Sequence, residues 1–177
     1  DITGQRVLVR EDLNVPMADG KVTDDTRLRA TVETVCELVD RGAKVLVLAH
    51  FGRPKGPSAE LSLQQVVAPY AEVLGRPVRY IDWEVDAAEV ATLAPGDIAV
   101  LENTRFFGGE EKNDPLVVAR FATLGDFYVN DAFSAAHRAH ATTEGLARLL
   151  PAYAGRSMQA ELEALDMDAE HAGELRV

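Results

Sequence analysis

The sequence has little cysteine, no long apolar run and much less positive than negative charge. Its single cysteine, Cys36, cannot form a disulfide within the chain, which fits a reducing compartment. No apolar run approaches the roughly 20 residues that cross a bilayer, and no secretory signal is visible, so we expect a cytoplasmic location without a membrane partner. The chain has 18 basic and 29 acidic residues, and its net charge of -11 argues against a nucleic-acid partner.

Several catalytic motifs are also absent. No Gly-x-x-x-x-Gly-Lys-[Ser/Thr] phosphate loop occurs, and no Gly-x-Gly-x-x-Gly opens a helix after the first apolar run. No Gly-x-Ser-x-Gly elbow occurs and Cys36 is predicted to lie within a helix, so acyl-enzyme chemistry lacks a nucleophile. The histidines form no convincingly spaced ligand pair on one helix, so we expect no metal site.

Short β-rich apolar runs alternate with amphipathic stretches along the chain. The runs predict strands at residues 6–9, 44–49, 78–81, 98–101 and 126–129. The amphipathic stretches predict helices at residues 24–41, 62–74, 85–93, 114–124 and 142–150, with a further helix starting at 158–165. This order predicts an α/β fold of three α/β/α layers, Rossmann-like, with a mainly parallel sheet. We expect residues 1–155 to form one domain, and the polar tail at 166–177 to be a frayed end or a cut point.

Polar side chains follow four of the predicted strands. The carboxyl ends of parallel strands share one edge of the sheet, where ligands of such folds bind, so we expect the four strand ends to converge on an anionic ligand. The polar residues expected at this edge are Asp12, Asn14, His50, Arg53, Arg105, Asp131, His137, Arg138 and His140, joined by Arg27 if its helix starts near the same rim.

Each of these residues also has a plain structural interpretation. A single arginine at a strand end is usually a solvated charge, and Arg10 is expected to pair with a nearby carboxylate. His137 and His140 fit a supporting role better than ligand contact, and Asp12 and Asp131 could be turn or cap residues. Composition and spacing by themselves predict an anion-binding α/β domain and nothing narrower.

Five motifs in register carry a more specific resemblance. They are Arg10-Glu11-Asp12-Leu13-Asn14-Val15-Pro16, Thr26-Arg27-Leu28, His50-Phe51-Gly52-Arg53-Pro54, Leu101-Glu102-Asn103-Thr104-Arg105-Phe106, and Asn130-Asp131-Ala132-Phe133 continuing through Ala136-His137-Arg138-Ala139-His140. With these motifs the chain resembles the N-terminal, 3-phosphoglycerate-binding domain of the phosphoglycerate kinase family, from about Gly4 to Leu165. That family reversibly transfers a phosphoryl group between 1,3-bisphosphoglycerate and ADP, giving 3-phosphoglycerate and ATP.

The resemblance implies roles for individual residues. It assigns the glycerate end of the substrate to Asp12 and Asn14, and the phosphate and its neighbouring groups to His50, Arg53, Arg105 and Arg138. Leu13, Phe51 and Gly52 lie within the same motifs, where the family has Phe and Leu in place of Leu13 and Phe51. Arg27 matches the arginine that stabilises the transferring phosphoryl group, a catalytic role.

The resemblance also implies what this chain lacks. Mg-ATP or Mg-ADP would be bound by a C-terminal nucleotide domain whose glycine-rich motifs are missing, so we expect no cofactor on this chain. Ala160 stands where many members carry a lysine that reaches the nucleotide, so no nucleotide-binding residue is assigned. We expect a monomeric and inactive fragment, with residues 156–177 beginning the interdomain helix. The alternative is a stand-alone, non-catalytic domain that binds a phosphorylated organic acid.

Overall fold

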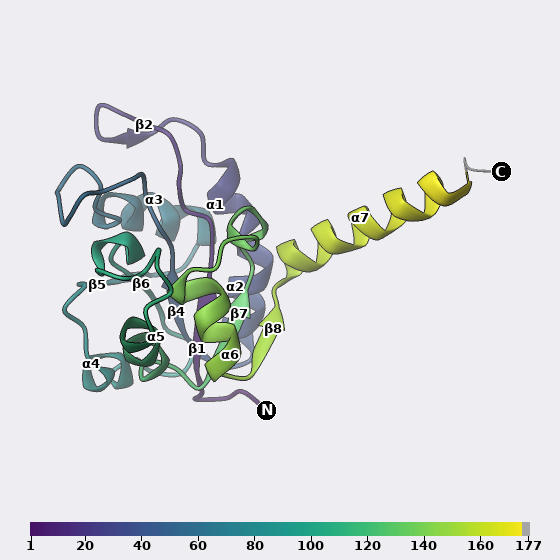
Figure 1. Cartoon of the computed structure of the whole chain (residues 1–177). Helices are drawn as coiled ribbons and strands as arrows, with labels where there is room; N and C mark the ends of the chain where they lie inside the picture. Colours follow the sequence, from purple (N-terminus) through teal and green to yellow (C-terminus); the bar gives the residue numbers. More distant parts are fainter. Residues whose placement is uncertain (175–177) are drawn as a thin grey trace.

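The fold is organised around a six-stranded sheet in which every strand pairing is parallel. A computed structural model describes residues 1–174 of the chain (Figure 1). In sheet order the strands are β5 (Arg79–Ile81), β6 (Ile98–Leu101), β4 (Lys44–Leu48), β1 (Arg6–Arg10), β7 (Phe127–Asn130) and β8 (Ala152–Ala154). The α/β fold predicted from the sequence is confirmed. Strand β8 was missed because its three residues are all exposed and show no apolar run.

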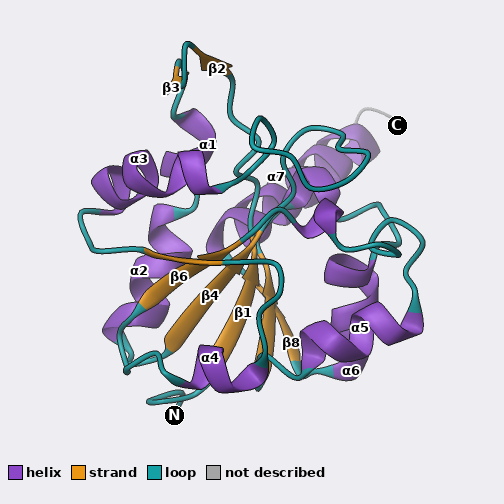
Figure 2. Ribbon diagram, turned by 90° about the vertical axis from the view of Figure 1, so that its left-hand side faces the viewer, coloured by secondary structure: helices purple, strands orange, loops and turns teal. Residues whose placement is uncertain are grey.

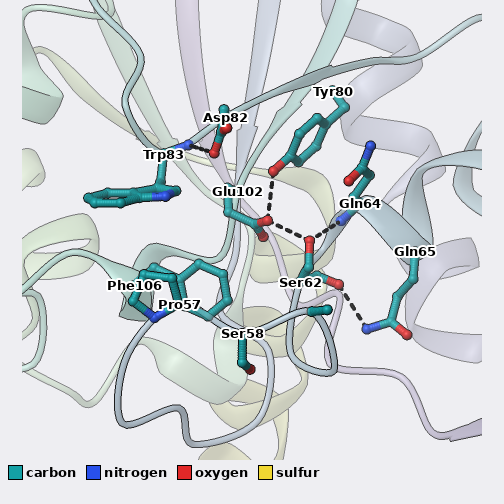
Figure 3. A pocket seen from close by; sticks show the side chains of 11 residues that line it. Pro57, Ser58, Ser62, Gln64, Gln65, Tyr80, Asp82, Trp83, Glu102 and Phe106 are labelled. Carbon is teal, nitrogen blue, oxygen red and sulfur yellow. Dashed lines mark hydrogen bonds between the residues drawn. The ribbon is translucent and has the colours of Figure 1, made fainter.

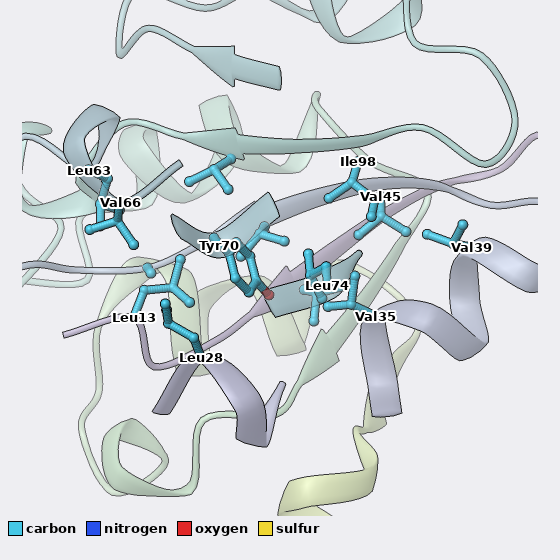
Figure 4. Close-up of a cluster of buried hydrophobic side chains, with 14 of the residues drawn as sticks. Leu13, Leu28, Val35, Val39, Val45, Leu63, Val66, Tyr70, Leu74 and Ile98 are labelled. Carbon is cyan, nitrogen blue, oxygen red and sulfur yellow. The ribbon is translucent and has the colours of Figure 1, made fainter. Parts of the chain in front are cut away.

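Helices cover both faces of this sheet (Figure 2). One face carries α1 (Thr26–Ala30), α2 (Val32–Asp40) and α3 (Gln64–Leu74). The other carries α4 (Ala87–Ala91), α5 (Pro115–Ala122) and α6 (Leu146–Leu149). The first helix set packs on a core that contains Val7 and Val9, shown in part in Figure 4, and the second set packs on a core that contains Leu8. Successive side chains of a strand point to opposite faces, so one apolar run supplies both cores.

The helix predicted at residues 24–41 is divided into α1 and α2 at Thr31. The Thr31 hydroxyl donates to the carbonyl of Leu28 at 2.9 Å and shares a 2.6 Å hydrogen bond with the hydroxyl of Tyr70 on α3. Such side-chain bonds to the preceding turn compete with regular helix geometry. Apolar periodicity does not report this break, because Leu28 and Val35 keep their helical spacing across it.

A short hairpin and three tight helical turns lie between the main elements. A small antiparallel hairpin is formed by β2 (Met17–Ala18) and β3 (Lys21–Val22). Its central residues have positive φ, as a two-residue hairpin turn requires. The helix predicted at 142–150 is a π-helical turn (Ala141–Gly145) followed by α6. Two 3₁₀ turns, Thr104–Phe106 and Phe133–Ala135, follow β6 and β7.

The last helix, α7 (Arg156–Glu174), projects away from the body of the domain (Figure 1). It starts close to the position predicted for residues 158–165. Of the tail predicted to be a frayed end or a cut point, residues 166–174 continue this helix, while residues 175–177 lie outside the described part. Alanine, glutamate and methionine have high helix propensity, and they sustain a helix here without a regular apolar pattern. Within residues 1–174 no helix combines the length and apolarity needed to cross a membrane.

Candidate functional site

The four strand ends identified in the sequence lie side by side. β6, β4, β1 and β7 are consecutive neighbours in the sheet and run in one direction, so their polar continuations leave at the same edge. Arg10, at the end of β1, stands in register with Leu48 on one side and with Asn130 on the other. The four strand ends therefore share one edge of the sheet, as predicted, while their convergence on an anionic ligand stays a prediction.

A hydrogen-bonded cluster joins the end of β1 to the start of α1. The backbone N–H of Asn14 donates to Asp12 Oδ1 at 3.0 Å. Arg27 Nε lies 3.7 Å from Asp12 Oδ2, and Arg27 Nη1 donates to the carbonyl oxygen of Asn14. The Ser134 hydroxyl donates to Asp12 Oδ2 at 2.9 Å from the segment after β7. Arg27 is thereby held at the rim while its side chain stays half exposed.

Gly52, in the loop after β4, joins that loop by hydrogen bonds to the segments that follow β1 and β6. Its N–H donates to Asn14 Oδ1 at 3.1 Å, and its carbonyl accepts from Arg105 Nη1 at 2.8 Å. Gly52 has a φ of +61°, and a Cβ there would lie 2.7 Å from Leu61 Cδ2, so a larger residue would strain the loop. The side chains of Leu13 and Phe51 are buried in the core, so only their backbone can face a ligand.

His50 is held as a neutral hydrogen-bond donor. Arg10 Nη2 lies 2.9 Å from His50 Nδ1. Because a guanidinium only donates, Nδ1 must accept, and the ring proton must sit on Nε2. Burial of the ring, followed by the charges of Arg10, Arg105 and Arg138, lowers the pKa of His50 from 6.5 to about 3. At neutral pH the ring therefore offers a donor without adding positive charge.

Arg10 is buried, yet it forms no ion pair with any carboxylate in the described part of the chain, contrary to the prediction. It donates to Thr142 Oγ1 at 3.1 Å and to the carbonyl of Glu11 at 2.8 Å, besides His50. Thr142 Oγ1 in turn bonds to both carboxylate oxygens of buried Glu110 at 2.9 Å. The carboxylate thus meets Arg10 through an intervening hydroxyl. Sequence reasoning missed Thr142 and Glu110, because neither follows a strand and their partners are distant in sequence.

The three arginines predicted to meet the phosphate differ in their surroundings. The Arg105 side chain is nearly buried, with Nε 3.4 Å from Glu111 Oε1, and burial lowers its pKa. Arg53 and Arg138 are exposed, and their side chains form no hydrogen bond or ion pair with any of residues 1–174. The charge of Arg138 lowers the pKa of both His50 and Arg105, which places it in the same rim, whereas no contact joins Arg53 to the others. Two cations therefore remain without counter-charges.

The two neighbouring histidines differ in setting. The ring of exposed His137 packs edge-on against Phe133, with centroids 5.5 Å apart. The backbone N–H of half-buried His140 donates to Thr143 Oγ1 at 3.0 Å, and burial lowers its pKa. The supporting roles expected for both histidines stay predictions.

Two hollows open near this edge. One, of about 220 Å³, adjoins the rim and is lined by Asp12, Arg27 and Ser134 together with buried Glu11 and Asp131. The other, of about 590 Å³, lies beyond β5 and β6 (Figure 3). In that groove Glu102 accepts hydrogen bonds from the Ser62 and Tyr80 hydroxyls and from the N–H groups of Leu63 and Asn103.

These contacts saturate Glu102, and no arginine or lysine lines the groove of Figure 3. An anion therefore meets no cationic side chain there, and the strand-end edge that carries Arg27, Arg53, Arg105 and Arg138, here called the basic rim, is the better candidate site. Among the described residues, no group of three or more histidine, cysteine, aspartate or glutamate side chains could hold a metal ion.

Comparison with known proteins gives one consistent result. The family model described as phosphoglycerate kinase matches residues 1–174. A phosphoglycerate kinase of Novosphingobium aromaticivorans is 76% identical over 166 residues, covering 93% of this chain and 42% of the relative, and one of Zymomonas mobilis is 65% identical over 170 residues, covering 94% and 43%. The solved phosphoglycerate kinase of Coxiella burnetii superposes with a TM-score of 0.85 at 36% identity, covering 93% of this chain and 42% of its own.

The chain spans less than half the length of these relatives. The segments that carry the rim all fall within the matched residues 1–174. The chain belongs to the phosphoglycerate kinase family.

Proposed function

We propose that this chain is the 3-phosphoglycerate-binding part of a phosphoglycerate kinase. In that enzyme it would take part in reversible phosphoryl transfer between 1,3-bisphosphoglycerate and ADP, giving 3-phosphoglycerate and ATP. The observation that carries the proposal is the basic rim, where Arg53 and Arg138 stand without counter-charges in a chain whose net charge is -11. Family membership supports this assignment of the rim.

The geometry supports a division of labour at the glycerate end of the ligand. Asp12 accepts hydrogen bonds and suits a substrate hydroxyl. Asn14 uses Oδ1 to accept from Gly52, while its Nδ2 donates to none of residues 1–174 and is available to a ligand oxygen. The backbone of Leu13, Phe51 and Gly52 completes this wall.

The phosphate of the ligand would meet the basic rim. Its partners are Arg53, Arg105, Arg138 and the Nε2–H of His50. Arginine suits a phosphate because its planar fork donates two parallel hydrogen bonds and keeps its charge. A neutral His50 adds a donor without further charge repulsion among the arginines.

Arg27 has the catalytic role in this proposal. Phosphoryl transfer spreads negative charge over the equatorial oxygens of the transferring group, so positioned cations lower its barrier. Arg27 now contacts Asp12 and the carbonyl of Asn14, and its half-exposed side chain must leave them to reach the transferring group.

The nucleotide side of the reaction is assigned outside these residues. Mg-ATP or Mg-ADP is a substrate of the proposed reaction, and a separate C-terminal domain would bind it. We propose that residues 1–155 form the substrate domain and that 156–177 begin the interdomain helix. The protein is proposed to be a cytoplasmic monomer with small-molecule partners only.

Calorimetric titration of 3-phosphoglycerate into the chain tests the site. Each charged hydrogen bond is worth about 1.5–3 kcal/mol, so Arg53→Ala and Arg138→Ala should each weaken binding about 10-fold to 100-fold. Arg27→Ala should weaken binding less, since Arg27 serves the transferring group. Arg29→Ala is the matched control, because Arg29 lies on the same helix and pairs with Asp25 at 2.9 Å. Unchanged affinity in all three rim variants would refute the assignment.

ATP formation separates the enzyme from a stand-alone binding module. Both would bind 3-phosphoglycerate, but only the enzyme makes ATP from 1,3-bisphosphoglycerate and ADP. The assay requires the product of the whole gene, since phosphoryl transfer needs both substrates in a closed, water-poor cleft. Substrate binding without any ATP formation by that product would favour the binding module.

A further inference from the structure

Two buried carboxyl groups lie side by side behind the rim. Glu11 follows β1 and is 1% exposed, while Asp131 follows β7 and is 4% exposed. Their strands are adjacent, and the N–H of Asp131 donates to the carbonyl of Arg10 at 2.9 Å. Glu11 Oε1 and Asp131 Oδ2 are both buried without a hydrogen-bond partner in the described chain. Buried polar atoms rarely stay unpaired, so this pair of oxygens needs an explanation.

A single proton satisfies both atoms. Two carboxylates in one buried site cannot both ionise without a large cost, so one of them keeps its proton. Burial, followed by hydrogen bonding to Asp131 and the charge of Asp131, raises the pKa of Glu11 well above its ordinary value. Of the two, Glu11 is thus the better holder of the proton, and its O–H would donate to the unpartnered Oδ2 of Asp131.

The groups facing this pair do not remove its proton. The charge of Arg10 lowers the pKa of Glu11, but burial, which is the largest contribution, and the charges of Asp131 and Asp12 all raise it. Tyr70 of α3 faces the pair as a neutral phenol, since burial raises its pKa well above the usual value. Across the adjoining hollow lie Arg27 of α1 and Glu161 of α7.

The other oxygen of Asp131 holds the start of α7. Asp131 Oδ1 accepts from the N–H of Ser157 at 2.9 Å and from the N–H of Met158 at 3.3 Å. Gly155 fits beneath it only because it has no side chain, as a Cβ would lie 2.2 Å from Asp131 Oδ1. Asp131 therefore touches α7 with one oxygen and Glu11 with the other. Glu11 in turn directly precedes Asp12 of the rim.

We propose that Glu11 and Asp131 form a positioning pair, in which the carboxyl proton of Glu11 holds Asp131 and thereby fixes the start of α7 against the rim segment that carries Asp12. In this role both residues act through the backbone segments that they hold, not as ligands of the substrate. The effect on substrate affinity rests on the function proposed above, whereas the effect on α7 is independent of it.

Two substitutions at one position separate positioning from simple burial. Glu11→Gln keeps the shape and supplies an amide donor to Asp131, while Glu11→Met keeps the length and supplies no donor. In Glu11→Met, amide hydrogen exchange at Ser157 and Met158, measured by NMR, should accelerate at least 10-fold, and affinity for 3-phosphoglycerate should fall several-fold. In Glu11→Gln both quantities should stay within about twofold of the native chain.

The unmodified chain provides a direct check of the proton. Infrared spectra at pH 7 should contain the band of a protonated carboxyl group, and Glu11→Gln should remove it. The proposal is overturned if that band is absent, or if the Gln and Met variants exchange their Ser157 and Met158 amides at the same rate. Amide exchange needs no ligand, so a native chain that fails to bind 3-phosphoglycerate would refute the proposed function and leave this test intact.

Discussion

The neutral state of His50 makes the stability of the chain depend on pH in a way that one substitution should remove. The folded protein lowers the pKa of this ring from 6.5 to about 3. The unfolded chain therefore takes up a proton near pH 6.5, whereas the folded chain does so only near pH 3. Acid consequently favours unfolding throughout this window, and the stabilisation from a neutral His50 is fully present only above pH 6.5.

The size of this effect follows from the shift. One proton taken up only by the unfolded state changes the free energy of unfolding by about 1.4 kcal/mol per pH unit. Between pH 7.5 and 4.5 the contribution of His50 should fall by about 2.5 kcal/mol, since most of that range lies between the two pKa values. Carboxylates also make the free energy of unfolding depend on pH, so the contribution of His50 has to be measured by comparison with a variant that lacks the ring.

His50→Asn provides the comparison. The amide oxygen of asparagine can take the position of Nδ1 and accept from Arg10, but the side chain does not titrate. Urea unfolding of both chains at pH 7.5, 6.0 and 4.5 gives the stability difference between them. The native chain should lose about 2.5 kcal/mol relative to His50→Asn over this range, because the carboxylates are common to both.

Two outcomes would contradict this reasoning. Parallel stability curves for the native and His50→Asn chains would mean that the ring does not titrate differently in the two states. An NMR titration in which the His50 ring of the folded chain protonates between pH 6 and 7 would show directly that the ring is not held neutral.

Two further substitutions test the framework around the rim. Gly52→Ala should destabilise the chain by about 1–3 kcal/mol in urea unfolding, because the residue has φ +61° and a Cβ would press on Leu61. Gly56→Ala is the control, since a Cβ there meets nothing within 4 Å. Equal losses of stability in the two variants would contradict the argument. Glu102→Gln should lower the free energy of unfolding by about 2–3 kcal/mol, because it leaves hydrogen-bond donors unpaired. Affinity for 3-phosphoglycerate should stay native. A loss of affinity without a loss of stability would instead place the groove of Figure 3 in the substrate site.

The architecture was predictable because buried strands and amphipathic helices differ in the spacing of their apolar residues along the chain. Continuous apolar runs such as residues 44–49 marked the interior strands, and parallel pairing then placed their polar ends at one edge. Strand β8 was not predictable, because its exposed residues join the sheet through backbone bonds to β7 alone. The spacing of apolar residues within a short exposed segment carries no information about whether its backbone pairs with a strand.

The site was predictable only in its outer parts. Arg53 and Arg138 follow strands, and a signature makes them recognisable. The inner contacts depend on residues far apart in sequence, as in the bond from Arg10 to Thr142 across 132 positions. The burial of Glu11 was equally hidden, since a glutamate in a polar segment is normally solvated. Such groups become visible only when the fold shows what surrounds them.

The projecting helix α7 has a mechanical consequence. Its 19 residues span about 28 Å at 1.5 Å per residue. Its first turn is held by Asp131 and by the ion pair of Arg156 with Glu37, while the rest extends from the body (Figure 1). A rotation of about 10° at that anchored end would carry the far end through about 5 Å. A small displacement of the first turn of α7, of a fraction of an ångström, thus becomes a displacement of several ångströms at the far end of the helix.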